Sequence, residues 1–294
     1  MKSIELGLEW FLNPDHLPFI AGIEKGWFRD AGLDLTLIEP KGHYDGLAEV
    51  AKGKLAFACN EPLHMIDEAR PGLRALGCFF ETEGGVMLTP EGEQALKRGE
   101  AIRVASPVAG EVTDDLARLI VARWCEREGI RFESSQLQIE AAGFEHLKNL
   151  QAGFHGAWLC FANFEGVEAR ELGVAARLIS SVEVGLPNFS ALELFTGEAF
   201  QREYPEVIEA VTRIASEGAT LCRDDPDEAM QLWYRHSGEA QSDLMDAIVR
   251  DTCRRLVAPV VRDAERWRDM WQQFQRLGLS QVDQAGYEAM FSPV

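Results

Sequence analysis

Polar and aromatic side chains that could recognise a small molecule gather at the ends of predicted strands. The first group ends a strand predicted over Ile4–Trp10. Trp10 offers an indole face on which a flat ring could stack. Asn13 presents both an amide donor and an acceptor, and His16 lies on the first turn of the next predicted helix. The spacing therefore predicts a binding loop for a flat, polar molecule.

A second group follows the strand predicted over Leu55–Cys59, where Asn60 and His64 come in close succession. The carboxyl ends of neighbouring parallel strands meet at one edge of a sheet, so both groups are expected to face the same ligand site. Plainer roles stay open, because Trp10 could pack within its lobe and Asn13 could merely form a turn in which Asp15 caps the helix. Acid–base chemistry by a histidine is the enzymatic alternative to binding.

The second half of the chain supplies further candidates at predicted strand ends and near the return of the chain. Free N–H groups in a strand-to-helix turn could hold a carboxylate or a phosphate, and a carboxylate could pair with an amine or a ring N–H. An ordinary connecting loop and a solvated carboxylate are the plainer interpretations. The candidates are Ser106, Gly110, Phe161, Asn163, Glu165 and Asn188.

Local motifs for metal binding and for nucleophilic catalysis do not occur in the sequence. The 6 histidines are dispersed without HxxxH, HxH or HExxH spacing, and no GxSxG elbow is present. The 6 cysteines are scattered without a CxxC pair, which is typical of buried thiols in a reducing compartment. The sequence therefore predicts neither a metal site nor a bound cofactor.

The composition is that of an acidic globular protein. Lys and Arg number 29 against 48 Asp and Glu, which gives a formal charge of −19 over 294 residues. Such a surface repels phosphate backbones and anionic lipids, so we expect no nucleic-acid partner and no membrane insertion. No stretch approaches the ~20 apolar residues of a membrane span, and no secretory signal pattern opens the chain. The chain as written is expected to be cytoplasmic, or periplasmic if an export signal has been removed.

The order of the predicted elements indicates an α/β fold with two lobes. Strand and helix signals alternate through two successive blocks, and the chain then returns through a strand predicted at Phe189–Phe195. The segment after this strand is predicted to be a helical tail packed on lobe one. We assign residues 1–88 and 186–294 to lobe one and residues 89–185 to lobe two, with a ligand cleft between them.

The segment from Leu6 to Cys78 resembles the pyrimidine-precursor-binding proteins of ABC transporters, and equally the yeast-type hydroxymethylpyrimidine phosphate synthases. The similarity rests on LEWFLNPDHLPFIAGIEKGWFRDAGLDLTLIEP, on Gly53–Phe57 and on Ala69–Gly72, and continues more weakly at Thr196–Val207. The resemblance implies a type II periplasmic-binding-protein fold, in which two α/β lobes joined by two crossings close on a ligand.

Two departures bear on the choice between transport and catalysis. The resemblance to the synthases implies a lysine that holds pyridoxal phosphate and a nearby histidine that is consumed; here Asn60 stands at the lysine position and His64 at the histidine position. Their cysteine-dense motif has no counterpart in Val182–Asn188. We therefore expect no cofactor and a substrate-binding protein for a thiamine-related pyrimidine or similar heterocycle, with an ABC-transporter permease as partner. A cytosolic enzyme that uses His16 or His64, and a cytosolic sensor or carrier, are the alternatives.

Overall fold

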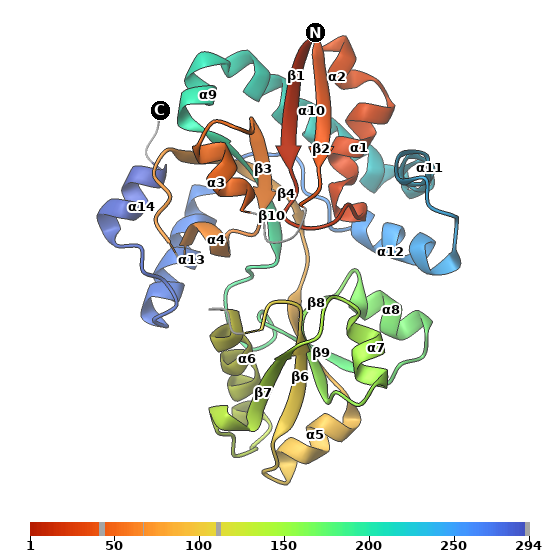
Figure 1. Cartoon of the computed structure of the whole chain (residues 1–294), viewed down its shortest axis with the longest axis vertical. Helices are drawn as coiled ribbons and strands as arrows, with labels where there is room; N and C mark the ends of the chain where they lie inside the picture. The colour runs from red at the N-terminus through yellow and green to blue at the C-terminus, as the bar shows by residue number, and fades with distance from the viewer. Residues whose placement is uncertain (41–44, 67, 110–112, 292–294) are drawn as a thin grey trace. The chain divides into compact units, whose positions relative to one another are not determined.

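The chain forms two compact units, which we call unit one (residues 1–81 and 191–294) and unit two (residues 82–190). The residues that the computed structural model describes are 1–40, 45–66, 68–109 and 113–291. Unit one is therefore discontinuous in sequence, whereas unit two is a single segment. The chain passes between them twice, at 81/82 and at 190/191 (Figure 1).

Within its described residues, unit one holds a five-stranded sheet in the order β2-β1-β3-β10-β4. β1 runs parallel to both of its neighbours, whereas β10 runs antiparallel to β3 and β4. The returning strand thus lies inside the sheet and joins β4 to the rest. The strands are β1 (Lys2–Gly7), β2 (Leu33–Ile38), β3 (Phe57–Asn60), β4 (Leu73–Glu81) and β10 (Ala191–Gly197).

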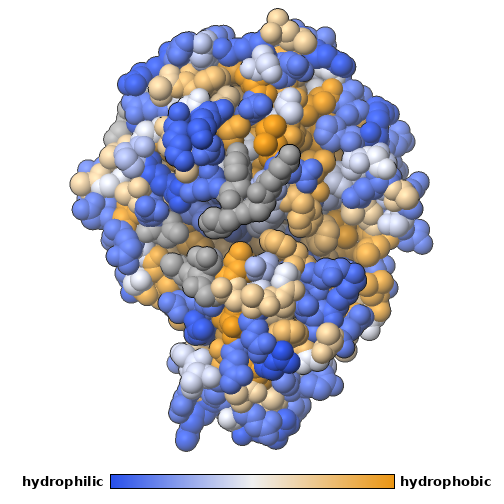
Figure 2. Space-filling view, viewed as in Figure 1, coloured by the Kyte–Doolittle hydropathy of each residue, from blue (hydrophilic) through white to orange (hydrophobic). Residues whose placement is uncertain are grey.

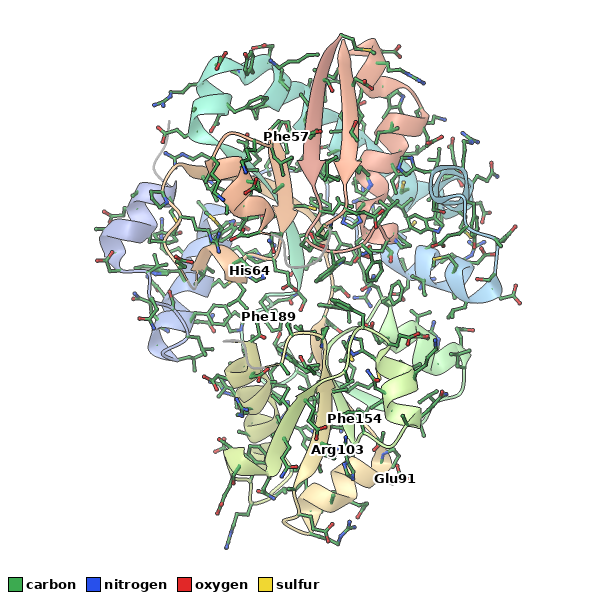
Figure 3. The ribbon with its side chains drawn as sticks, viewed as in Figure 1. Phe57, His64, Glu91, Arg103, Phe154 and Phe189 are labelled. Carbon is green, nitrogen blue, oxygen red and sulfur yellow. The ribbon has the colours of Figure 1, made fainter. Side chains whose placement is uncertain are left out.

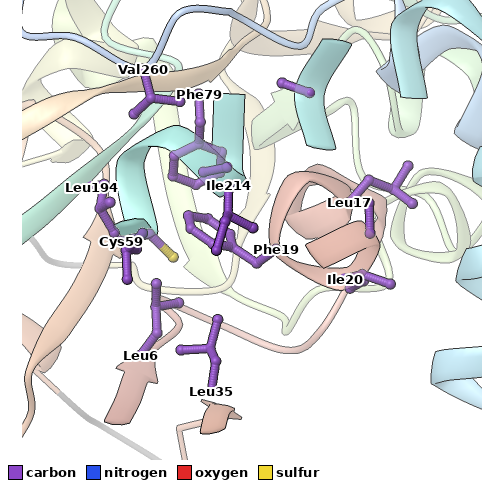
Figure 4. Packing of buried hydrophobic residues seen from close by; sticks show 14 of the residues in the cluster. Leu6, Leu17, Phe19, Ile20, Leu35, Cys59, Phe79, Leu194, Ile214 and Val260 are labelled. Carbon is purple, nitrogen blue, oxygen red and sulfur yellow. The ribbon is translucent and has the colours of Figure 1, made fainter. Parts of the chain in front are cut away.

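Helices pack on the sheet of unit one through buried apolar side chains. Figure 4 shows Phe19 and Phe79 in this core, with their ring centroids 4.9 Å apart and their planes almost perpendicular. The same core includes Cys59, which Figure 4 shows near Leu6 and Leu194. The helices are η1 (Pro14–His16, a 3-10 turn), α1 (Leu17–Glu24), α2 (Trp27–Asp30), α3 (Gly46–Ala51), α4 (Leu63–Ile66), α9 (Glu198–Glu203), α10 (Pro205–Asp224), α11 (Pro226–Ser237), α12 (Asp243–Cys253), α13 (Ala264–Arg276) and α14 (Gln284–Phe291).

Unit two is built around a second sheet, in which the described strands follow the order β7-β6-β8-β5-β9. β5 is antiparallel to both neighbours, and β6 is parallel to both of its own. The guanidinium of Arg103 covers the ring of Phe154 at 4.4 Å from its centroid (Figure 3). The elements are β5 (Gly84–Leu88), α5 (Pro90–Lys97), β6 (Ile102–Ser106), α6 (Thr113–Arg127), η2 (Ser134–Gln136), β7 (Leu137–Ala141), α7 (His146–Gln151), β8 (Gly156–Phe161), α8 (Glu165–Glu171) and β9 (Arg177–Ser180).

The predicted α/β class is confirmed, and individual elements differ from their predicted bounds. The first strand ends at Gly7, so Trp10 lies in the following loop and does not end the strand. The sequence predicts one helix over Pro18–Ala31, but this segment is divided by Gly26, whose φ of 77° suits glycine and breaks the α-helical path. β5 was not predicted, and because it pairs with β8 and β9, the first crossing precedes it.

Hydrophilic residues cover much of the surface. Figure 2 shows hydrophilic side chains spread over the face in view, with apolar residues in smaller groups. Among the residues that the structure describes, no helix combines the length and the apolar character that crossing a bilayer requires.

Candidate functional site

The predicted site residues of unit one lie at the carboxyl ends of β1 and β3, which are adjacent and parallel. Figure 3 labels Phe57, where β3 begins, and His64, which lies beyond its end in α4. β10 enters the sheet from this edge, because Glu193 near its start pairs with Asn60. Three strands therefore bring polar residues to one edge of the sheet.

The turn after β1 is organised by Asn13 and His16. Oδ1 of Asn13 accepts a hydrogen bond from the backbone N–H of Asp15 at 2.8 Å, which caps the 3-10 turn. Nδ2 of Asn13 donates to the carbonyl oxygen of Phe11 at 3.3 Å. Both polar atoms of this buried amide thus stabilise the turn itself. The turn agrees with the plainer interpretation, but the capping residue is Asn13 and not Asp15.

His16 is completely buried, and one of its ring nitrogens is held by the turn. Nδ1 lies 3.1 Å from the carbonyl oxygen and 3.3 Å from the backbone nitrogen of Asn13. Nε2 points the other way and lies 3.8 Å from Oε1 of Glu9. Burial lowers the pKa of His16 to about 4, although the bond to Asn13 opposes this shift. The imidazole is therefore neutral at neutral pH.

Glu9 and Cys59 complete a buried polar cluster with His16. The Cys59 thiol donates to Oε2 of Glu9, with sulfur and oxygen 3.2 Å apart. Burial raises the pKa of Glu9 well above its ordinary range. The hydrogen bond from Cys59 lowers this pKa in part, whereas the nearby charges of Glu61 and Asp15 raise it further. Burial also raises the pKa of Cys59, with Glu9 contributing. Nε2 of His16 and Oε1 of Glu9 have no hydrogen-bond partner within the described ranges.

A second histidine–glutamate pair follows β3. Nε2 of His64 lies 4.0 Å from Oε2 of Glu61, and the His64 side chain is 40% exposed. Burial raises the pKa of Glu61 to about 8. Oδ1 of Asn60 accepts from the backbone N–H of Glu61 at 2.8 Å, and the residue is half-buried. His64 is therefore the more accessible of the two predicted histidines.

In unit two, the structure brings Phe161 and Glu165 together. The backbone N–H of Phe161 donates to Oε2 of Glu165 at 2.8 Å, across the turn that leads from β8 into α8. Asn163 lies inside this turn and is fully buried. Glu165 begins α8 and is buried, so it is not the solvated carboxylate of the plainer interpretation.

Ser106 ends β6 and is fully buried. Its Oγ accepts from the backbone N–H of Val108 at 3.3 Å, which fixes the start of the loop. Gly110 was predicted in the same loop and lies outside the described residues. The predicted anion-binding turn therefore stays a prediction.

Asn188 joins the two segments of unit two that lead to the crossings. Its Nδ2 donates to the carbonyl oxygen of Thr82 at 2.9 Å, and its Oδ1 accepts from the backbone N–H of Ser190 at 3.1 Å. A backbone hydrogen bond of 2.8 Å from Thr82 to Ser190 accompanies it. This side chain therefore links the outgoing and returning segments.

Three residues with buried side chains at the edge of unit one were not among the predicted site residues, namely Glu9, Cys59 and Glu61. Glu9 directly precedes Trp10 and falls within the strand predicted over Ile4–Trp10. Cys59 was interpreted as an inert buried thiol, which is the usual role of scattered cysteines. The role of Glu9 could not be predicted from its neighbours in sequence, because its partners His16 and Cys59 are 7 and 50 residues away.

Glu193 makes the stability of unit one dependent on pH. It is 2% exposed, its carboxylate lies 3.6 Å from Arg266, and burial raises its pKa from 4.5 to about 7 against the effect of Arg266. The folded chain keeps the Glu193 proton at pH values where an unfolded chain has lost it. The contribution of this proton to the free energy of unfolding is therefore complete below pH 4.5 and is lost as pH rises through about 7. In Glu193→Gln, the free energy of unfolding relative to wild type should rise by roughly 2 to 3 kcal/mol between pH 4.5 and 8.

Urea denaturation of both proteins across this pH range measures the difference. Glu91→Gln changes an exposed glutamate of unit two and serves as the matched control (Figure 3). A difference between Glu193→Gln and wild type that stays constant with pH would contradict the assignment.

Comparison with known proteins adds a family and a fold. The family model described as "NMT1/THI5 like" matches residues 13–229. The formylaminopyrimidine-binding protein of Halalkalibacterium halodurans is 22% identical over 92% of this chain and 84% of its own length. The 4-amino-5-hydroxymethyl-2-methylpyrimidine phosphate synthase of Legionella pneumophila is 21% identical over 86% of this chain and 79% of its own.

Among solved structures, the periplasmic aliphatic sulphonate binding protein SsuA of Escherichia coli superimposes with a TM-score of 0.67. The two share 12% identity, and the match covers 96% of this chain and 94% of the other. The likeness shows that the chain has the periplasmic-binding-protein fold, as predicted.

Proposed function

The chain belongs to the NMT1/THI5-like family, and from this membership we propose that it binds a thiamine-related pyrimidine or a similar flat nitrogen heterocycle. It does so as the ligand-binding component of an ABC-type uptake system, a role that places it outside the cytoplasm and gives it a permease as partner. The formylaminopyrimidine-binding relative supports this ligand class, and the fold shared with SsuA supports a binding role.

One observation favours binding over the synthase reaction. Asn60 occupies the end of β3, and its Oδ1 is engaged by the backbone N–H of Glu61. An amide has no nucleophilic amine, so it cannot form the Schiff base that pyridoxal phosphate requires. The amide can instead present a donor and an acceptor to the edge of an aminopyrimidine.

We assign roles to residues at the edge of unit one accordingly. Trp10 is half-buried in the loop after β1 and provides a face for stacking. Asn60 and His64 read polar groups of the ring, while Asn13 and His16 hold the loop. In unit two, Ser106, Gly110, Phe161, Asn163, Glu165 and Asn188 are proposed to contact the ligand or to support residues that do.

Calorimetric and thermal-shift titration of the purified chain tests this assignment. The probes are formylaminopyrimidine and hydroxymethylpyrimidine, with pyridoxal phosphate and an alkanesulfonate as the competing classes. Ligand at 100 times its dissociation constant stabilises a one-site protein by about 2.7 kcal/mol, which gives a clear shift. A shift with the sulfonate alone, or with none of the heterocycles, would refute the pyrimidine assignment.

Trp10→Ala is expected to weaken heterocycle binding by about tenfold, because the loss of a stacking partner costs roughly 1 to 1.5 kcal/mol. Isothermal titration of the variant against the tightest heterocycle measures the change. Trp27→Ala removes another half-buried indole of unit one, on α2, and should leave the affinity unchanged. Equal losses in both variants would show that Trp10 acts through stability and not through contact.

A further inference from the structure

The buried cluster of Glu9, His16 and Cys59 has the donor set of a metal site. One ligand atom from each side chain, a carboxylate oxygen, an imidazole nitrogen and a thiol sulfur, lies within 4.8 Å of the other two. The sequence offered no metal motif, because these residues come together only when β1 and β3 pair. We propose that Glu9, His16 and Cys59 bind a thiophilic divalent cation, with Zn²⁺ as the best match.

The distances suit this ion. Zinc binds nitrogen and oxygen at about 2.0 to 2.2 Å and sulfur at about 2.3 Å, so neighbouring ligands in a tetrahedral site lie about 3.3 to 3.8 Å apart. Oε1 of Glu9 lies 3.8 Å from Nε2 of His16, and Oε2 of Glu9 lies 3.2 Å from Sγ of Cys59. The first separation lies at the upper limit of this range and the second just below it, and they involve different oxygens of Glu9. Small rotations of the Glu9 side chain are therefore sufficient to bring the donors to bonding distance of one ion.

Two buried polar atoms of the cluster lack hydrogen bonds among the described residues, which points to a bound ligand. His16 is 0% exposed, so its Nε2 atom cannot reach solvent. This atom also has no hydrogen-bond partner among the described residues. Oε1 of Glu9 is likewise buried and without a hydrogen bond there. Leaving such atoms unsatisfied is costly, and a cation that accepts both lone pairs would remove that cost.

The surroundings orient the ligands as metal sites usually require. In the tautomer that carries the proton on Nδ1, His16 donates to the carbonyl oxygen of Asn13 at 3.1 Å and turns its Nε2 lone pair toward Glu9. This tautomer gives up the weaker contact in which Nδ1 accepts from the backbone N–H of Asn13 at 3.3 Å. A ligating histidine almost always makes such a second hydrogen bond. One carboxylate, one thiolate and one neutral imidazole also balance the charge of a divalent cation, which a buried site needs.

The chemical types of the three donor atoms favour a soft or borderline cation over a hard one. Sulfur and imidazole ligands favour Zn²⁺, Co²⁺ or Cu⁺, whereas Ca²⁺ and Mg²⁺ take oxygen ligands. The single carboxylate does not supply the several oxygens that those hard cations need. The inference goes beyond the proposed binding function, because it concerns a cluster inside unit one and involves no heterocycle.

Titration of the chelator-treated full chain with Co²⁺ alone tests the inference. A sulfur-to-cobalt charge-transfer band and tetrahedral d–d bands should appear at one equivalent and disappear when Zn²⁺ is added. In Cys59→Ser the charge-transfer band should be lost, and in His16→Gln and Glu9→Gln the affinity should fall by at least about tenfold. The matched controls Cys160→Ser and His146→Gln change buried residues of unit two and should retain wild-type binding.

The result that overturns the inference is a wild-type chain that binds no Co²⁺ or Zn²⁺, or a charge-transfer band that persists in Cys59→Ser. Circular dichroism establishes whether each variant folds. If Cys59→Ser does not fold, Glu9→Gln decides, because it keeps the size of the side chain and must still weaken metal binding. The titration contains no heterocycle, so its outcome is independent of the proposed ligand.

Discussion

Phe19→Ala is expected to lower the free energy of unfolding of unit one by about 3 to 5 kcal/mol, the cost of truncating a fully buried aromatic side chain. Phe19 is 0% exposed and packs edge-on against Phe79 with ring centroids 4.9 Å apart (Figure 4). The substitution removes this contact and leaves a cavity between α1 and the sheet. Urea denaturation followed by circular dichroism measures the loss.

Phe19→Leu separates the volume of the side chain from its aromatic character. Leucine retains most of the apolar volume, so its cost should stay at about 1.5 kcal/mol or less. A loss below 1.5 kcal/mol for Phe19→Ala would contradict the assignment of this residue to the packed core. Because α1 begins directly after His16, the truncated variant should also bind ligand more weakly at a given temperature.

Gly218→Ala is expected to destabilise unit one by about 3 kcal/mol, at the upper end of typical overpacking costs. Gly218 lies on α10 against α1, and a Cβ atom there would be 2.1 Å from the carbonyl oxygen of Pro18 and 2.9 Å from its carbon. Backbone atoms cannot rotate away, so the two helices must separate. Thermal and urea denaturation measure the effect.

Gly166→Ala provides the matched control for this substitution. Gly166 lies in α8, and the nearest atom to its added Cβ is 3.7 Å away, an ordinary contact distance. Alanine is favoured over glycine in helices, so the variant should be neutral or stabilised by up to about 1 kcal/mol. Similar losses in both variants would show that the close approach to Pro18 is not the cause.

The alternation of strands and helices was predictable because it follows from local patterns of hydrophobicity. In Leu33–Ile38, leucines alternate with polar residues, and this local pattern predicts a strand with the observed bounds. β5 was not, because Gly84 and Gly85 resemble a turn. Gly85 is glycine for a tertiary reason: a Cβ there would lie 2.0 Å from the carbonyl oxygen of Ile179 in β9. A constraint between strands so distant in sequence leaves no local signal.

In the candidate site too, contacts between residues adjacent in sequence could be predicted, whereas contacts between distant residues could not. The turn at Asn13–Asp15 could be predicted, because it is made by adjacent residues, although its cap is Asn13 and not Asp15. The association of Glu9 with Cys59 could not, because it depends on the pairing of Gly7 in β1 with Ala58 in β3. Spacing along the chain identified residues near the sheet edge but not the contacts among them.

The position of β10 has a consequence for the order in which the chain folds during synthesis. β4 joins the sheet of unit one only through β10, which lies more than 100 residues later in the sequence. Unit two is one uninterrupted segment, so a ribosome releases all of it before Ala191 emerges. Because domains generally fold as units, the second unit can be complete while the first still lacks β10, the strand that joins β4 to its sheet. Residues 1–81 therefore keep an unpaired sheet edge until Ala191–Gly197 has been synthesised.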